Sequence, residues 1–513
     1  MLSSSILGKL YAIWLQSAVY SFLRNIYRAF SRGFKNSVIV HWFVRESRSE
    51  PIYCRSFFAH IFKAVFDFFD RLLHTLWAAI RRAGRDSAVR RFLHRFGPSS
   101  FFLKFETILG GAICLMFLVP HEHWSNSYAL LFAFGLFALY VLLVGAGKRK
   151  IYYLHDMGFP FLLFLFACVF SLGLSYDRSD SLRILLLYIT AFLFLYVLSA
   201  DLTTPARMRR LLGFLYLAVI FTSLYAFYQR ATGVAVNASL TDLTLNKGVP
   251  GRVFASFGNP NNYAEFLVMM SPLAAVFAAS RKNRYERLVL IIGMLLPFGA
   301  LLMTYSRSCW ISMLLCCIVF VYYADKKLLP LFFMLCIAAV PFLPDSVMTR
   351  IGTLFNSSDS SNQFRLYIWD GTTKMALDYL PGGIGLGPGS FALVYPHYAN
   401  PHALVGVPHS HMVYLELIIE LGILGFVSYM WYMLRLWKDS TCTLLKTQSR
   451  LGRCILIACL SGMIGIAFAF GVEYVWYYPR TFFTWFILAG IAVAAMRMSG
   501  AADEKYLGNG EMS

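Results

Sequence analysis

The chain has 513 residues, of which 58% are hydrophobic and only 14% are charged. This composition excludes an ordinary soluble protein of that length and indicates a polytopic membrane protein. The formal net charge of +20 suggests nucleic acid at first sight. The basic residues flank apolar runs, however, so a membrane surface explains the charge better and no nucleic-acid partner is predicted.

Residues 1–104 differ from the rest of the chain. The first hundred residues hold 16 Lys and Arg against 5 Asp and Glu. Their longest uncharged run, between Lys9 and Arg24, is shorter than the roughly 20 apolar residues that a membrane span needs. Aromatic residues and leucines alternate with Arg, as in the stretch 21–30, a pattern typical of amphipathic helices on an anionic membrane surface. We predict a cytoplasmic, basic, interfacial region, with a partly disordered extension as the alternative.

Residues 105–497 predict an all-α transmembrane domain, because apolar runs alternate there with short polar breaks. The runs indicate about twelve helices, at 103–119, 127–146, 159–176, 184–200, 211–228, 263–280, 287–303, 308–324, 328–344, 412–437, 454–474 and 481–497. Residues 498–513 would form a cytoplasmic tail.

The distribution of Lys and Arg predicts the orientation of these helices. Alternate breaks are rich in basic residues and should be cytoplasmic, whereas the opposite breaks are poorer in them and should face outward. Both termini then lie in the cytoplasm. Two of the outward breaks, 229–262 and 345–411, are long, and long loops in compact proteins are usually functional or disordered. We expect 345–411 to fold over the bundle.

A glycine-rich stretch, 381–391, lies in the second long loop. It superficially resembles a nucleotide-binding loop but lacks the spacing and the surrounding strands and helices of that motif. Its glycines instead predict a tight turn that allows close backbone approach to another loop or to a substrate.

Three arginines on the predicted outer side are candidates for binding phosphate. Arg252 lies in the first long loop, Arg307 in a tight turn between two helices, and Arg365 in a helical part of the second long loop. A guanidinium group binds phosphate bidentately and keeps its charge. For Arg252 and Arg307 the alternative is an anchor at the membrane interface. Neighbouring polar side chains complete the candidate binding set: Asn259, Asn261, Ser306 and His409.

His411 is the candidate catalytic base, because a histidine can take a proton from a hydroxyl near neutral pH. It stands at the mouth of a predicted membrane helix. Glu416 follows five residues later, a rise of about 7.5 Å along a helix, and is a second catalytic candidate that could orient the histidine. Glu420 lies one further turn along the same face. For both carboxylates the alternative is a structural hydrogen bond within the membrane.

The sequence predicts neither a metal site nor a cofactor. The outer loops lack paired acidic residues, and the histidines of the second long loop do not have the spacing of a zinc site. Arginines beside a base at a membrane surface favour transfer from a lipid-linked diphosphate, with guanidinium groups in place of a cation.

Several motifs together resemble one family. They are Arg252 with the following Phe-Gly-Asn-Pro-Asn, Ser306-Arg307 with Trp310, and the glycine-rich turn leading to His411. In this order and placement, over about residues 105–497, the chain resembles the O-antigen ligase and polymerase superfamily, whose members resemble GT-C-type glycosyltransferases. Met412 departs from the pattern, since the family commonly has Asn after this histidine.

The resemblance implies transfer of a glycan from undecaprenyl diphosphate to an acceptor hydroxyl, with inversion at the sugar carbon, on the outer side of the bacterial cytoplasmic membrane. It implies that Arg252 and Arg307 bind the diphosphate and that His411 is the base or orients the acceptor, with Arg365 as a weaker candidate. The acceptor is left open among glycan, lipid and protein hydroxyls. A flippase of the same lipid and a non-catalytic scaffold are the alternatives.

Overall fold

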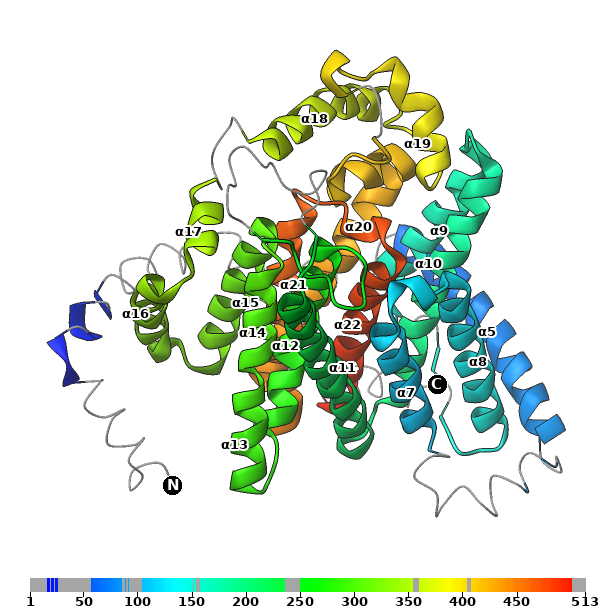
Figure 1. The fold of residues 1–513 in the computed structure, drawn as a ribbon. Helices are drawn as coiled ribbons and strands as arrows, with labels where there is room; N and C mark the ends of the chain where they lie inside the picture. Colours follow the sequence, from blue (N-terminus) through cyan, green and yellow to red (C-terminus); the bar gives the residue numbers. More distant parts are fainter. Residues whose placement is uncertain are drawn as a thin grey trace.

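The computed structural model describes residues 16–18, 20–22, 24–25, 57–84, 88, 91, 104–150, 152–153, 157–235, 250–353, 359–403 and 407–500. Within these ranges the long elements are all helices (Figure 1). Their bounds are α5 Phe57–Gly84, α7 Phe105–Leu118, α8 Asn126–Gly145, α9 Phe159–Leu174, α10 Arg178–Asp201, α11 Pro205–Thr232, α12 Pro260–Ala279, α13 Arg284–Gly293, α14 Leu295–Met303, α15 Arg307–Asp325, α16 Leu329–Ala339, α17 Asp345–Gly352, α18 Ser360–Asp378, α19 Pro388–Val394, α20 Val413–Lys446, α21 Arg450–Phe470 and α22 Pro479–Met498.

The predicted all-α membrane architecture is confirmed. Among the described residues, nine helical stretches are long and apolar enough to cross a membrane, and α7 and α9 are shorter apolar helices. Each of the twelve predicted runs is helical. The difference in number arises because α15 and α16 follow one another almost without a break and form one continuous stretch, Arg307–Phe342.

Helices α12, α21 and α22 form the centre of the bundle, where most of their side chains are buried. Glycines allow these helices to approach their neighbours closely. A side chain at Gly465 of α21 would collide with Ser312 of α15, and one at Gly490 of α22 would meet the backbone of Leu195 in α10. Close packing at small residues is the usual way in which helices associate in a membrane.

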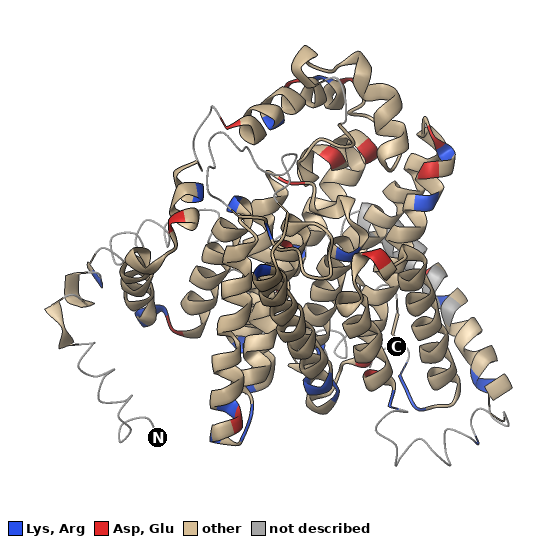
Figure 2. Cartoon of the chain, in the orientation of Figure 1, with Lys and Arg blue, Asp and Glu red and all other residues tan. Residues whose placement is uncertain are grey.

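Charged residues gather toward the two ends of the bundle (Figure 2). At the end away from α18, the breaks predicted as cytoplasmic contact one another through ion pairs. Arg210 Nη1 lies 2.5 Å from Glu106 Oε1, and Arg149 bridges Glu106 and Asp201. These pairs link α7, α10 and α11. Breaks that were predicted to lie on one side of the membrane therefore meet at one end of the bundle.

The second long loop folds over the opposite end of the bundle, where it forms α17, α18 and α19 (Figure 1). Its own apolar core contains Ile368 and Met375 of α18 with Phe391 of α19, packed against Ile419 of α20. This core holds α18 above the bundle, at what is called below the site end of the molecule.

The glycine-rich turn 381–391 docks against protein. The N–H of Gly385 donates to the carbonyl of Glu420 at 3.2 Å, and that of Gly387 donates to the Glu420 carboxylate at 2.9 Å. Gly385 has φ +97°, and a side chain there would collide with Ser175. In α20, Gly422 has φ 66° and interrupts the helix where the turn packs. The glycine-rich turn was predicted to approach either another loop or a substrate. These contacts show it against another segment of the chain.

Helix α5 is the main described part of the basic N-terminal region, and it packs beside α8 (Figure 1). Trp77 is buried there, with its ring edge-on to Tyr140 at a centroid distance of 6.2 Å. Most of the aromatic and basic stretch 21–30 lies outside the described residues. The interfacial location of this region therefore stays a prediction.

Candidate active site

The loop before α20 holds His411 at the site end by contacts with its neighbours. The backbone N–H of Ser410 donates to Glu416 Oε2 at 2.7 Å, and Trp369 Nε1 of α18 donates to the carbonyl of Ser410 at 3.0 Å. Glu416 is in the first turn of α20, where a carboxylate can accept from the chain that enters the helix. Helices α18 and α20 thus fix the residue next to His411.

His411 itself has an unusual backbone conformation. Its φ is 54°, in the left-handed region that non-glycine residues seldom occupy. Its backbone N–H donates to His409 Nδ1 at 3.1 Å. The ring of His409 is buried between Tyr474 and Tyr477, with centroid distances of 5.3 and 4.5 Å. His409 therefore supports the strained loop, and since its Nδ1 accepts, the proton of its neutral ring lies on Nε2.

Burial lowers the pKa of His409 well below 6.5, and the neighbouring His411 lowers it further. The charge of Glu473 raises the pKa of His409, but burial has the larger effect because the protonated ring loses its hydration. His409 is therefore neutral at physiological pH, as its acceptor role toward the His411 N–H requires.

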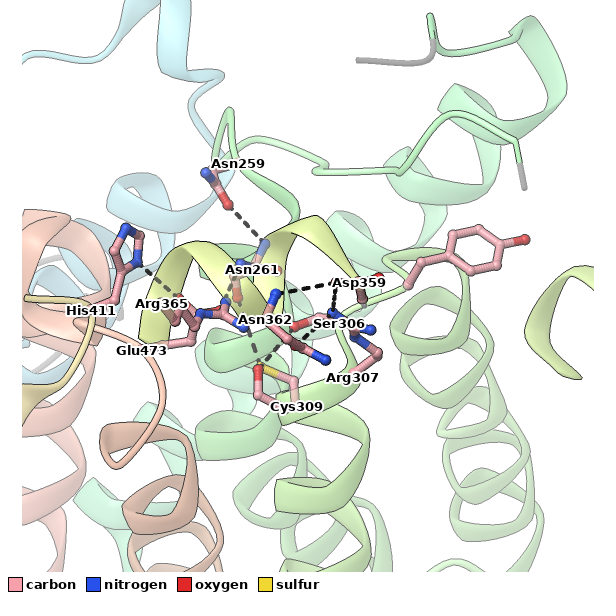
Figure 3. A network of polar contacts seen from close by, with 12 residues as sticks. Asn259, Asn261, Ser306, Arg307, Cys309, Asp359, Asn362, Arg365, His411 and Glu473 are labelled. Atoms are coloured by element: carbon pink, nitrogen blue, oxygen red, sulfur yellow. Dashed lines mark hydrogen bonds and ion pairs between the residues drawn. The ribbon is translucent and has the colours of Figure 1, made fainter. Parts of the chain in front are cut away.

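Glu473, between α21 and α22, is the carboxylate that faces His411. Its Oε2 lies 3.7 Å from His411 Nδ1, and in Figure 3 the other ring nitrogen of His411 points away from Glu473. The His411 side chain is 25% exposed, whereas that of Glu473 is 10% exposed. The histidine therefore has one nitrogen toward a buried carboxylate and the other toward the open side of the site.

Glu473 has two further partners. Its Oε1 forms an ion pair with Arg365 of α18 and accepts from Asn261 Nδ2 of α12 at 3.2 Å. Burial alone would raise the pKa of Glu473, but the charge of Arg365, together with His411 and His409, lowers it to about 2. Glu473 thus carries a permanent negative charge and joins three segments that are distant in sequence.

Arg252 lies beside this carboxylate. Its Nε donates to the carbonyl of Thr304 at 2.7 Å, and its Nη2 donates to Asn261 Oδ1 at 2.5 Å. The side chain is buried, and burial, followed by the like charge of Arg350, lowers its pKa to about 9. Arg252 remains a cation at neutral pH, in surroundings that favour the approach of an anion.

Arg307 begins α15 and is held by the segment around α17 and α18. Its Nη2 lies 2.9 Å from Asp359 Oδ1 and 3.1 Å from Asn362 Oδ1. Its Nη1 donates to the carbonyl of Thr353 at 2.7 Å. Arg307, which was predicted to bind the diphosphate, therefore lies at the site end and forms an ion pair with the buried Asp359.

Two other predicted binding residues have structural partners. Asn259 caps α12, where its Oδ1 accepts from the Asn261 N–H at 2.8 Å, and its Nδ2 donates to the Tyr478 hydroxyl at 3.3 Å. Ser306 precedes α15, and its buried hydroxyl lies 3.5 Å from that of Ser308.

Neither glutamate of α20 contacts the His411 ring in the described contacts. Glu416 was predicted as a residue that could orient the histidine. Its carboxylate accepts from the backbone N–H of Ser410, and the carboxylate beside the ring belongs to Glu473. The Glu416 carboxylate is occupied by the loop backbone, whereas the α21–α22 connection brings Glu473 beside the imidazole. Glu420 binds Gly387 and the Tyr474 hydroxyl, which agrees with a structural role.

Sequence reasoning missed Glu473, Asp359 and Arg350. Glu473 is an isolated acid at the end of the predicted run 454–474, and in the structure it lies between α21 and α22. An ionisable residue at a membrane boundary is a signal that could have identified it. Among the described residues, no group of three His, Cys, Asp or Glu side chains is placed to hold a metal ion.

Comparison with known proteins places part of the chain in relation to one family model. No curated protein matches the chain at a significant level. Residues 292–430, from α13 into α20, match the family model described as O-antigen ligase. This stretch includes Arg307, Arg365 and His411, and it supports a general role in glycan ligation or polymerisation. The match over 292–430 confirms the resemblance of this chain to the O-antigen ligase and polymerase superfamily.

Proposed function

We propose that this protein transfers a glycan from an undecaprenyl-diphosphate-linked donor to an acceptor hydroxyl at the outer face of the cytoplasmic membrane. The acceptor is a hydroxyl of a glycan, a lipid or a protein. The observation that carries the proposal is the pairing of His411 with the buried Glu473 beside Arg252 and Arg365. A base and several fixed cations at the end of a membrane bundle suit a charged, membrane-borne donor.

The acceptor is activated by His411. The ring nitrogen that faces away from Glu473 takes the proton of the acceptor hydroxyl, and the hydroxyl oxygen attacks the anomeric carbon of the donor. A bond forms between that oxygen and the anomeric carbon while the bond to the diphosphate oxygen breaks. Attack opposite the leaving group inverts the anomeric centre. Glu473 stabilises the imidazolium that results, in the way a buried carboxylate supports the histidine of a catalytic triad.

The leaving diphosphate is stabilised by arginines. Arg252 and Arg365 flank the Glu473–Asn261 pair, and Arg307 lies beyond the Thr304–Ser306 turn. Fixed guanidinium groups in a largely buried site stabilise the charge that develops as the bond breaks. We propose that they act without a metal ion.

The test is a reconstituted transfer reaction. The full-length protein in lipid vesicles receives an undecaprenyl-diphosphate-linked oligosaccharide and a hydroxyl acceptor, and both glycosylated acceptor and free undecaprenyl diphosphate are measured. The two products should appear in equal amounts, with an inverted anomeric linkage by NMR and an unchanged rate in EDTA. Movement of the intact donor across the bilayer without release of undecaprenyl diphosphate would contradict the proposal and favour a flippase.

A further inference from the structure

Arg350 of α17 is a fourth buried arginine at the site end. It is 4% exposed. Its Nε donates to the carbonyl of Tyr305 at 3.3 Å, next to the Thr304 carbonyl that accepts from Arg252. Consecutive carbonyls of one turn therefore hold two arginines side by side. Tyr305 has φ 52°, and this strained conformation directs both carbonyls toward arginines.

The four arginines form two clusters, each built around one carboxylate. In the Glu473 cluster, Arg365 pairs with Glu473 and Arg252 is joined to it through Asn261. A second set, the Asp359 cluster, comprises Asp359 with Arg307 at 2.9 Å and Arg350 at 4.0 Å. In each cluster two guanidinium groups share one carboxylate. Each cluster thus offers two guanidinium groups, which are the groups that bind phosphate bidentately.

The clusters lie in a definite order. Figure 3 shows His411 at one side, then Arg365 and Glu473, then Asn261, and Arg307 with Asp359 at the other side. A diphosphate diester has two phosphates, and each carries one negative charge. The two clusters match this arrangement, because each offers two guanidinium groups and they adjoin at the Thr304–Tyr305 carbonyls.

The surroundings differ at the two ends of this row. The Glu473 cluster adjoins His411, where the sugar must react. The Asp359 cluster includes Arg350 of α17. The preceding segment exposes apolar side chains, among them Ile337 of α16 at 73% and Phe342, between α16 and α17, at 87%. In a bilayer such residues contact lipid. The polyprenyl chain would therefore leave the site on this side.

We infer that the Asp359 cluster, with Arg350 as an unassigned binding residue, takes the lipid-side phosphate of the donor, while the Glu473 cluster takes the sugar-side phosphate. The inference rests on the proposed function and adds a direction to it. The donor lies with its sugar at His411 and its polyprenyl chain over α16 and α17. Arg307 then binds the lipid-side phosphate, and Arg252 lies where the two phosphates join.

The experiment compares two probes, farnesyl diphosphate and farnesyl phosphate, which have the same chain and differ by one phosphate. Binding to the full-length protein in nanodiscs is measured for the wild type, Arg350→Gln and Asp359→Asn. Arg350→Gln should reduce the preference for the diphosphate about tenfold or more, because a charged hydrogen-bond donor is lost. Asp359→Asn should tighten diphosphate binding, because it removes the competing carboxylate while an Asn still caps α18.

The opposite signs separate binding from folding, since a folding defect would weaken binding in both variants. The matched control is Arg230→Gln, which removes an exposed arginine at the end of α11 and should leave both affinities unchanged. Weaker diphosphate binding in Asp359→Asn, or an unchanged preference in Arg350→Gln, overturns the inference. Loss of transfer in His411→Ala, measured alongside, reports on the proposed function independently of these binding results.

Discussion

Glu473 Oε2 lies 3.7 Å from His411 Nδ1, although 62 positions separate the two residues in sequence. The carboxylate is charged because Arg365 holds its pKa low. The pair gives the imidazole a defined orientation and a partner for its positive charge. This relationship turns a histidine in a loop into a candidate general base.

Replacing Glu473 by Gln should reduce the turnover number about 100-fold or more and leave the donor KM nearly unchanged, because the amide cannot stabilise the imidazolium. Steady-state kinetics in vesicles would measure both constants. Glu122→Gln removes an exposed carboxylate from the same end of the bundle and is the matched control. A turnover number equal to that of wild type would remove Glu473 from the mechanism.

His411→Ala should abolish glycan transfer, with a loss of at least about 100-fold, while expression and topology are retained. The His411 side chain is partly exposed and does not belong to the apolar core, so its removal should cost little stability. His402→Ala, at an exposed position of the same long loop, should keep full activity. Transfer that persists in His411→Ala would show that another residue is the base.

Arg252→Lys should raise the donor KM. A lysine keeps the charge but cannot bond to the Thr304 carbonyl and to Asn261 in the fixed geometry of the guanidinium group. The expected increase is about tenfold, the equivalent of one charged hydrogen bond of roughly 1.5 kcal/mol. Initial rates at several donor concentrations test this, and an unchanged KM would count against a role of Arg252 at the diphosphate.

The burial of His409 predicts that the stability of the protein depends on pH. Its pKa is lowered in the folded protein, so below about pH 6.5 the unfolded chain binds a proton that the folded chain does not. Stability should therefore fall with decreasing pH, by up to about 1.4 kcal/mol per pH unit, until the folded pKa is reached. His409→Asn keeps an acceptor for the His411 N–H and should lose less thermal stability between pH 7 and pH 5. Parallel losses in the two proteins would refute this assignment.

Gly385→Ala should destabilise the fold. The residue has φ +97°, and a methyl group there would collide with Ser175. A strained backbone and a steric clash together should cost about 1–3 kcal/mol or more. Gly352→Ala is the control, because no neighbouring atom lies within 4 Å of an added methyl group there. Equal melting temperatures of the two variants would contradict the docked turn.

Local patterns were sufficient to predict the helices. The run 211–228 lies within α11, and most of the run 454–474 lies within α21, because a span must satisfy its backbone hydrogen bonds internally and bear apolar side chains. The folding of 345–411 over the bundle was also predictable from its aromatic and helical stretches. The ends of the helices and the interruption at Gly422 depend on tertiary packing, which no local pattern records.

The candidate site was predictable only in part. Arg252, Arg307, Arg365 and His411 could be proposed because several arginines and a histidine gather on the same predicted side, where a guanidinium group can bind phosphate and an imidazole can act as a base. The carboxylate partners of Arg365 and Arg307 could not be predicted. Glu473 is 108 positions from Arg365 in sequence, and Asp359 is 52 positions from Arg307. Glu416 was the nearer acid in sequence, and proximity along the chain favoured it over the acid that is nearer in space.

Gly422 divides α20 into an outer part, which bears Glu416, and a longer inner part that lies in the bundle. The outer part is joined at one end to the His411 loop and at the other to the glycine-rich turn. Chimaeras with related proteins should therefore exchange residues 380–422 as one block. If the histidine loop alone were exchanged, it would pack against a first turn of α20 from another protein. The imidazole would then no longer be held in position beside Glu473.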